Sequence, residues 1–444
     1  MKIKHLTNTG SSRLLLFFAG WGMDENPFSS FRPTDCDFAV AYDYSVSTDA
    51  PLHSGHTEIM IVAWSFGVIA AGLFISRHPE LPITARIAVN GTLHPVDDRL
   101  GIPTAIFERT LAGLTEQSLS RFNRRMCGGA KAAETFNASR PNRSLDSLRN
   151  ELIAIAAMQN AGSAWDKAYI SLNDNIIPPD NQKTAWTLAN VDTIEIDAPH
   201  LPDLRSIFER EIIDKKLVAQ RFSNAIETYD DNAGIQRIIA SELSERWRAL
   251  CPSETIDSLI EIGAGTGLLT DSLCQWLTPR NLQLWDISQI SERLPGRHHI
   301  CDGETAIRKL SPETVDAIAT ASAMQWFCSP RSFIASCSKA LKKEGWLAIA
   351  TYGPDNFMEI RKPPYPSLSK LTQWIGNDME ILYADEQHIA RQFNSPKELL
   401  THIRLTGVNA VSQDSKTITE ARRIITRDLR TLTYHPIIMI ARNR

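Results

Sequence analysis

The sequence predicts an α/β protein built from two successive units, and two strand–turn–helix segments carry this prediction. The first begins at Glu58, turns at Ser65 and continues as a helix over residues 68–75. The second spans 258–269 and carries three glycines at its turn. In both segments a short apolar run precedes small residues and helical apolar spacing, which is typical of a parallel strand covered on both faces. A length of 444 residues leaves room for two or three domains.

Composition excludes several classes of protein. Hydrophobic residues make up 43% and charged residues 22%, enough to bury a sizeable core, and a net charge of −4 gives no reason to expect a nucleic-acid partner. The seven cysteines form no C-x-x-C pair and have no metal-ligand spacing, so we expect reduced thiols in a cytoplasmic protein without a metal. The apolar run 14–19 is too short to span a membrane, and we expect no membrane partner.

The first unit carries a serine at a tight turn. Strands are predicted at 13–18, 37–42 and from residue 58, and the last of these ends in Ala63-Trp64-Ser65-Phe66-Gly67. This is close to the G-x-S-x-G elbow, with Ala63 in place of the first glycine, and small residues are needed there because larger side chains collide across the turn. The backbone amides of Trp21, in a Gly-Trp-Gly turn, and of Phe66 are the expected donors to an oxyanion.

A nucleophilic serine needs a histidine to accept its proton and a carboxylate to orient that histidine. A strand at 167–172 is followed by Asp174, and a strand at 193–198 is followed by His200, which gives the chain order Ser, Asp, His. We therefore predict Ser65, Asp174 and His200 as the catalytic residues. Three alternatives stay open. The serine can be only a helix cap, Asp180 and Asp192 are rivals to Asp174, and the earlier histidines are rivals to His200. These histidines are His53, His56, His78 and His94.

A helical insertion at 108–158 is predicted to form a lid over the serine, a common place for substrate selection. Its middle is basic and contains one acid, Glu134. This pattern is either a solvated helical face or a docking surface for an acidic partner. The basic residues are Arg121, Arg124, Arg125, Lys131, Arg140 and Arg143.

The second unit begins near residue 211 and has a glycine turn with the spacing G-x-G-x-G. Gly263, Gly265 and Gly267 let the backbone approach a ligand, and the helix that follows points its first amides at that ligand. A nicotinamide site usually has G-x-G-x-x-G, whereas residue 268 is leucine. Glu261 before the first glycine can instead hold the amino group of the methionine part of S-adenosylmethionine.

Two later acids fit the same ligand. Asp286 ends a second strand and is placed to accept from ribose hydroxyls, and Asp302 follows a third strand and is placed to accept from an adenine amino group. The order of strand, glycine loop, acid, acid and strand resembles the class I S-adenosylmethionine-dependent methyltransferases, which have a Rossmann-like fold. This resemblance implies S-adenosylmethionine as the co-substrate.

Candidate contacts to the methyl acceptor lie outside this loop. Tyr229 belongs to an amphipathic helix at 220–233, and Gln325 and Trp326 follow the fourth strand, where substrates of open α/β sheets gather. The proline-containing stretch 358–384 is expected to cover the substrate. Strands at 346–353, 417–419 and 437–441 are expected to complete the sheet.

Longer motifs make the resemblance more specific. The second half looks like malonyl-acyl-carrier-protein O-methyltransferases of biotin synthesis. The residues that carry this resemblance are 222–233, the Gly263 loop, Ala323-Met324-Gln325-Trp326 and Tyr352-Gly353-Pro354. The first half looks like pimeloyl-acyl-carrier-protein methyl ester esterases of the short type, which have an α/β-hydrolase fold. The residues that carry this resemblance are 18–23, the Ser65 elbow, Asn90-Gly91-Thr92 and His200.

The two resemblances imply an esterase domain at 1–210 and a methyltransferase domain at 211–444. They imply acyl carrier protein as the partner, loaded with malonyl or with pimeloyl methyl ester, and Arg121, Arg124 and Arg125 as its contacts. Two other interpretations stay open: an esterase fused to a small-molecule methyltransferase of another pathway, or one half that is an inactive scaffold for the carrier protein.

Overall fold

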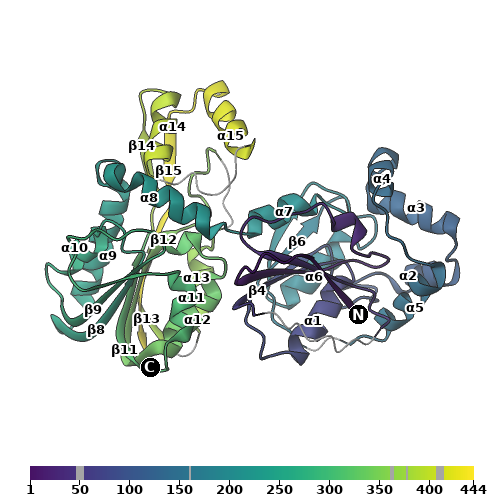
Figure 1. The fold of residues 1–444 in the computed structure, drawn as a ribbon, viewed down its shortest axis with the longest axis horizontal. Helices are drawn as coiled ribbons and strands as arrows, with labels where there is room; N and C mark the ends of the chain where they lie inside the picture. Colours follow the sequence, from purple (N-terminus) through teal and green to yellow (C-terminus); the bar gives the residue numbers. More distant parts are fainter. Residues whose placement is uncertain (47–54, 160–161, 361–364, 377–378, 407–414) are drawn as a thin grey trace. The chain divides into compact units, whose positions relative to one another are not determined.

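The computed structural model describes residues 1–46, 55–159, 162–360, 365–376, 379–406 and 415–444, with the backbone alone over 415–420. The chain divides into two compact units, Met1–Ile212 and Ile213–Arg444. Each unit has its own sheet of seven mostly parallel strands, so the predicted α/β class is confirmed (Figure 1). No helix in the described ranges is long and apolar enough to cross a membrane.

The first unit has the sheet order β1–β3–β2–β4–β5–β6–β7, with only β1 antiparallel to its neighbour. Its strands are β1 (Lys2–Thr7), β2 (Arg13–Phe18), β3 (Asp37–Tyr42), β4 (Glu58–Trp64), β5 (Ile83–Val89), β6 (Lys167–Ser171) and β7 (Asp192–Ile196). The central strands are fully buried, which explains their continuous apolar runs. The sequence interpretation missed β1, which is a half-exposed edge strand, and β5.

Helices connect these strands and extend beyond them. They are η1 (Asn26–Phe28), α1 (Gly67–Arg77), α2 (Thr104–Ala112), α3 (Glu116–Met126), α4 (Ala130–Asn137), α5 (Leu145–Ala156), α6 (Pro179–Leu188) and α7 (Leu204–Glu211). Helices α2 to α5 lie between β5 and β6 in the chain and form the helical insertion. A capping box at Thr115 begins α3, and the Ser144 side chain caps α5.

The second unit has the sheet order β10–β9–β8–β11–β12–β16–β13, in which β16 is antiparallel to both of its neighbours. The strand order reverses direction at β8, and ligands of such sheets bind at this point. Its strands are β8 (Thr255–Ile262), β9 (Thr278–Asp286), β10 (Arg297–Ile300), β11 (Val315–Ala321), β12 (Leu341–Tyr352), β13 (Met379–Glu386) and β16 (Pro436–Asn443), with β14 (Ile389–Gln392) and β15 (Thr431–Tyr434) forming a separate pair.

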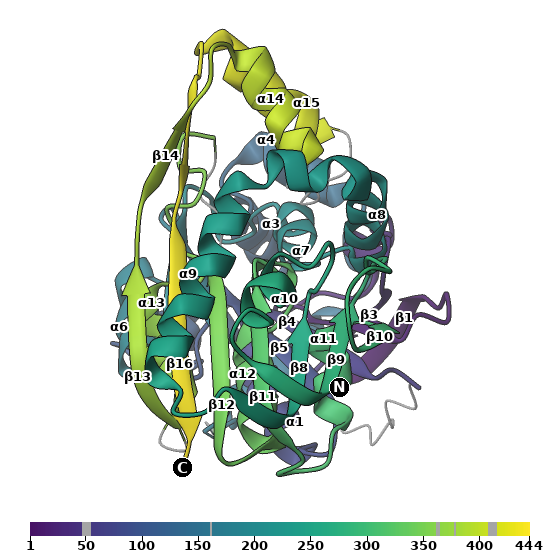
Figure 2. The same cartoon turned by 90° about the vertical axis from the view of Figure 1, so that its left-hand side faces the viewer.

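Both faces of this sheet are covered. Leu259 packs into one apolar cluster with α9 and α10, while Ile260 and Ile262 pack into another with α12 and α13, as alternating strand residues do. Figure 2 shows α14 and α15 beyond the strand ends, next to α8. The helices are α8 (Lys215–Asn232), α9 (Gly234–Leu250), α10 (Leu268–Leu273), α11 (Gly303–Ala306), η2 (Ile307–Lys309), η3 (Met324–Trp326), α12 (Pro330–Ala340), α13 (Leu368–Ile375), α14 (Pro396–Leu405) and α15 (Ser415–Thr426).

Two details of the predicted sheet are wrong. The expected strand at 417–419 lies within helix α15, because the short Thr-Ile-Thr run is followed by residues that favour a helix and Ile424 packs into the core. The seventh strand is instead β13, which begins inside the stretch 358–384 that was expected to be a cover and ends at Glu386. Its mostly exposed acidic residues hide the apolar alternation by which strands are recognised.

Candidate active sites

Ser65 stands at the end of β4, on a sharp turn into α1. Its φ of +58° is uncommon for a residue with a side chain, and such a strained turn is what a nucleophile elbow requires. Gly67 is needed because a Cβ there would lie 2.3 Å from the carbonyl oxygen of Phe18. Ala63 is fully buried and serves as the small residue on the other side of the serine. The elbow therefore keeps its shape with alanine at the first position.

The structure brings Ser65, His200 and Asp174 together in a relay. The Ser65 Oγ lies 2.9 Å from Nε2 of His200. On the other side of the imidazole, Nδ1 lies 2.8 Å from Oδ2 of Asp174. Each of the three residues is more than 90% buried. This geometry allows the imidazole to take the serine proton while the carboxylate fixes its orientation.

Asp174 is held in place by three further donors. The backbone amides of Ile176 and Ile177 donate to Oδ1 at 2.8 and 3.0 Å, and the Gln182 side chain donates to Oδ2 at 2.9 Å. The rival acids Asp180 and Asp192 are exposed. The sequence interpretation did not find Gln182, because only the fold of α6 brings this amide to the carboxylate.

A second set of contacts fixes the loop that carries His200. The Trp64 indole and the Asn90 amide both donate to the His200 carbonyl oxygen at 2.8 Å. Asn90 also accepts from the Ser171 amide at 2.7 Å and so ties three strand ends together. The rival His56 pairs with Asp37, His78 pairs with Glu80, His94 lies on the turn after β5, and His53 lies outside the described residues.

Trp21 and Phe66 line the same cavity as the serine and the histidine. Phe66 is the N-cap residue of α1, and backbone amides at the start of a helix have no partner within the helix. Among the described residues, neither the Trp21 amide nor the Phe66 amide has a hydrogen-bond partner. Both amides are therefore available to an oxyanion.

The cavity has a volume of about 670 Å³ and is walled by the helical insertion. Ile106 and Phe107 of α2, Phe122 of α3 and Leu152 of α5 give it an apolar wall. A buried ion-pair cluster anchors α5 beneath it: Arg143 lies 3.0 Å from Asp43 and 3.4 Å from Glu151. Burial raises the pKa of the Glu151 carboxyl from its ordinary value.

The basic residues of the insertion separate into two groups. Arg143 belongs to the buried cluster and therefore contributes nothing to a docking surface. Arg121, Arg124 and Arg125 lie exposed on α3, and Arg125 also borders the cavity. No ion pair joins any of these three to another residue in the part of the chain that the structure describes.

In the second unit, the glycine loop joins β8 to α10. Gly263, Gly265 and Gly267 all have positive φ. Gly263 also has no room for a side chain, because a Cβ there would lie 2.4 Å from that of Ala323. The Gly265 amide donates to Oδ2 of Asp286 at 2.9 Å, and the amide and hydroxyl of Ser288 donate to Oδ1. The loop is thereby fixed to the end of β9.

Glu261 is a buried carboxyl at the floor of this loop. It is 1% exposed, and its Oε2 accepts from the Thr270 hydroxyl at 2.7 Å. Burial raises the pKa of Glu261 to about 8, because no cation among the described residues offsets the loss of water. The ammonium group of a ligand would supply the missing charge, so this carboxyl fits the amino group of S-adenosylmethionine.

Two adjoining cavities open at the loop. The first, of about 630 Å³, is lined by Glu261, the loop residues 263–266 and Ser288. The second, of about 340 Å³, shares Phe222, Tyr229, Gln236 and Ser322 with the first. We call the first the donor cavity and the second the acceptor cavity.

The predicted acceptor contacts Tyr229, Gln325 and Trp326 line the acceptor cavity. Phe222 of α8 packs edge-on against Trp326, with the ring centroids 5.7 Å apart. The Trp326 indole nitrogen and Oε1 of Gln325 are buried without a partner among the described residues. Each such atom costs free energy unless a ligand pairs with it.

Asp302, which was predicted to accept from an adenine amino group, contacts other residues of the chain in the structure. Its Oδ1 lies 3.2 Å from Nζ of Lys215, and it also accepts from the amide of Glu304 at the start of α11. Burial acts to lower the pKa of Lys215, but the Glu304 and Asp302 carboxylates outweigh it and raise that pKa. Among the described residues, those that line the donor cavity do not include Asp302.

These features define the class of protein: an α/β-hydrolase unit with a serine relay, followed by a class I methyltransferase unit. Residues 1–210 match the family described as pimeloyl-ACP methyl esterase BioG, and residues 260–349 match the family described as methyltransferase domain. A relative from Bacteroides fragilis, named malonyl-[acyl-carrier protein] O-methyltransferase, is 35% identical over 97% of this chain and 93% of its own length. The chain belongs to this family and combines the two parts in one polypeptide.

Shorter relatives match each part alone. A malonyl-[acyl-carrier protein] O-methyltransferase from Haemophilus influenzae is 33% identical over 52% of this chain and 95% of its own length. The crystal structure of BioG from the same organism is 35% identical and covers 45% of this chain and 94% of its own, with a TM-score of 0.42. By the family matches and the full-length relative, the chain is a methyltransferase preceded by a BioG-type unit.

Proposed function

We propose that the second unit methylates the free carboxylate of malonyl-acyl-carrier protein with S-adenosylmethionine, and that the first unit hydrolyses the methyl ester of pimeloyl-acyl-carrier protein. The supporting observation is that one chain combines two sites of opposite chemistry: a serine relay, and a buried carboxyl beside a glycine loop. Methylation hides the charge of the malonyl group so that it can be elongated like an ordinary acyl chain. Hydrolysis later restores the carboxylate for biotin synthesis.

The acceptor cavity suits a carboxylate nucleophile. Its described lining contains aromatic, amide and hydroxyl side chains and no charged group. The malonyl carboxylate is already ionised near neutral pH, so the reaction needs no base and depends on alignment and on removal of water. Bound S-adenosylmethionine supplies a methyl group on a sulfonium. The Trp326 N–H and the Tyr229 hydroxyl are the donors that we assign to holding the carboxylate in line with it.

The serine relay supports ester hydrolysis by the usual two steps. The Ser65 hydroxyl attacks the ester carbonyl while His200 accepts its proton, and the amides of Trp21 and Phe66 stabilise the oxyanion. The tetrahedral intermediate expels methoxide, which takes the proton from His200 and leaves as methanol. Water then attacks the acyl-serine with His200 again as the base, and the free pimeloyl carboxylate leaves.

The test of both activities is mass analysis of the carrier protein. Incubation with S-adenosylmethionine and malonyl-carrier protein should add one methyl group to the acyl chain, and incubation with the pimeloyl methyl ester should remove one. Methylation of small carboxylic acids but not of the carrier-bound malonyl group would favour a methyltransferase of another pathway. Binding of the carrier protein without turnover at one site would mark that half as a scaffold.

The apolar wall of the hydrolase cavity predicts selection by chain length. The pimeloyl ester has four more methylenes than the malonyl ester, and each buried methylene contributes roughly 0.8 kcal/mol. We expect kcat/KM for the carrier-bound pimeloyl ester to exceed that for the malonyl ester by about two orders of magnitude. The glutaryl ester should fall between them, and equal rates for all three lengths would rule out this selection.

The exposed arginines of α3 predict a carrier-specific effect. The double variant Arg121→Glu/Arg124→Glu should raise KM for the carrier-bound ester about tenfold, because it replaces attraction of the acidic carrier by repulsion. Hydrolysis of a small soluble methyl ester should stay unchanged. Arg77→Glu, at an exposed arginine of α1 outside the insertion, is the matched control. A similar loss with both substrates would contradict a docking role.

A further inference from the structure

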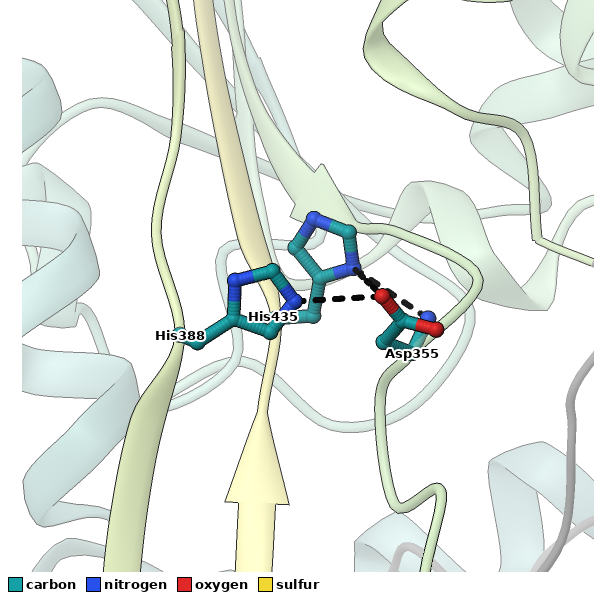
Figure 3. Close-up of side chains that lie close together, drawn as sticks. All are labelled: Asp355, His388 and His435. Carbon is teal, nitrogen blue, oxygen red and sulfur yellow. Dashed lines mark hydrogen bonds and ion pairs between the residues drawn. The ribbon is translucent and has the colours of Figure 1, made fainter.

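Three potential metal ligands meet in the second unit, away from the glycine loop. Asp355 follows β12, His388 lies between β13 and β14, and His435 lies between β15 and β16. Oδ2 of Asp355 is 3.2 Å from Nε2 of His388 and 3.9 Å from Nδ1 of His435. The two imidazoles stack with their centroids 4.2 Å apart. Figure 3 shows the three side chains converging from separate backbone segments.

We propose that Asp355, His388 and His435 bind a divalent transition-metal ion, with Zn²⁺ as the expected metal. One ligand atom from each residue lies within 4.8 Å of the others. Two imidazole nitrogens and one carboxylate oxygen are a donor set that zinc accepts, with bonds of about 2.0–2.2 Å. Ligand atoms around such an ion lie about 3–3.5 Å apart, so only small side-chain movements are needed.

The surroundings of His435 support ligation by Nδ1. This side chain is 4% exposed, and its Nε2 lies 3.1 Å from Oε2 of Glu386. That contact places the ring proton on Nε2 and leaves the Nδ1 lone pair directed at the cluster. A carboxylate behind the imidazole is the usual outer partner of a histidine ligand. The Asp355 amide also donates to Nδ1 at 3.2 Å, and a bound ion has to replace this contact.

The cluster is accessible and lies beside the acceptor cavity. The His388 side chain is 50% exposed and that of Asp355 47%, so an ion can enter and keep a water molecule as its fourth ligand. Asn356 and Tyr434, each next in the chain to a proposed ligand, line the acceptor cavity. His388 and His435 lie in the two connections between the main sheet and the pair β14–β15. A bound ion would therefore hold these two connections together.

The test is metal binding by the full-length, tag-free chain after treatment with a chelator. Competition with a chromophoric chelator should reveal one Zn²⁺ site that His388→Ala weakens at least tenfold. His78→Ala is the matched control, since His78 is also an exposed histidine next to a carboxylate, Glu80, but belongs to the first unit. Equal Zn²⁺ affinity in the wild type and the His388→Ala variant would overturn the proposal.

Two further measurements distinguish this cluster from metal binding by cysteine thiols. The chain has seven free cysteines, so Cu²⁺ electron paramagnetic resonance should show two nitrogen ligands in the wild type and one in the His388→Ala variant. Zn²⁺ should also raise the Tm of the wild type and leave that of the variant unchanged. A spectrum without imidazole nitrogens, or the same Tm shift in both proteins, would refute the site.

Discussion

The variant Ser65→Ala is expected to abolish ester hydrolysis and to leave methyl transfer at the wild-type rate. The Ser65 Oγ is the only atom that we assign as the nucleophile, and it lies 2.9 Å from the imidazole that activates it. Removal of a nucleophile from such a relay lowers kcat by roughly 10⁴–10⁶-fold. Methyl transfer should be unaffected because the glycine loop and the acceptor cavity belong to the other unit.

Both activities should be measured on the same preparation of the variant, with the two carrier-bound substrates. Ser76→Ala is the matched control, because Ser76 is an exposed serine of α1, the helix that begins at the elbow. His200→Ala should reproduce the loss seen with Ser65→Ala, and the double variant should be no worse, since the two residues act as one unit. Hydrolysis that survives in Ser65→Ala would require another nucleophile and would contradict the proposed mechanism.

The elbow was predictable because its signal is local. Ala63, Ser65 and Gly67 are neighbours in the chain, and the steric demand of a strand–turn–helix junction acts on those positions directly. Asp174 and His200 were predictable from chain order and from their places just after strands. The structure places His200 beside Ser65 and Asp174 on the other side of the imidazole, whereas Asp180 and Asp192, the rivals to Asp174, are exposed.

Contacts between distant segments were not predictable in this way. Asn90 holds the His200 carbonyl across 110 residues, and Trp64 does so across 136. Arg143 looked like one more basic residue of a helical face, but it pairs with Asp43, which lies on a different part of the chain. The proposed metal ligands give no sequence signal, because His388 and His435 lie 33 and 80 residues from Asp355.

The edge of the second sheet shows a different limit. Among the described strands, β13 pairs only with β16, and Met379 alone of its residues is buried, so its sequence lacks the apolar pattern of a buried strand. The run at 417–419 has β-branched residues that favour a strand locally, but it forms the first turns of α15. Propensity over three residues is too weak to decide against the packing of a whole helix.

The variant Glu261→Gln is expected to weaken binding of S-adenosylmethionine by about 10²-fold or more and to leave ester hydrolysis unchanged. Removing one partner of a buried charge pair costs about 2–5 kcal/mol, because the ammonium of the ligand is left without a counter-charge. Glutamine keeps the size of the side chain and its contact with Thr270. Isothermal titration with S-adenosylmethionine measures the loss, and Glu254→Gln, an exposed glutamate before β8, is the control.

The same substitution should remove a pH effect on stability. The pKa of Glu261 is about 8 in the folded chain against an ordinary value of 4.5, so between these values the folded state binds more protons than the unfolded state. The stability of the wild type should therefore fall as pH rises from about 4.5 to 8, by at most about 1.4 kcal/mol per pH unit, and remain low above it. The Glu261→Gln variant has no such proton to lose. Near pH 8, the Tm at which its second unit unfolds should therefore exceed that of the wild type.

S-adenosylmethionine provides the decisive comparison, because its ammonium stabilises the ionised carboxyl and lowers the pKa of Glu261. Saturating ligand should therefore remove most of the loss of Tm between pH 5 and 8 in the wild type. In the Glu261→Gln variant the ligand should leave the pH dependence of Tm unchanged, because no carboxyl titrates at this position. If the two proteins showed the same pH profile without ligand, the pKa of Glu261 would not be raised in the folded chain. If saturating ligand left the wild-type profile unchanged, the ammonium would not pair with this carboxyl.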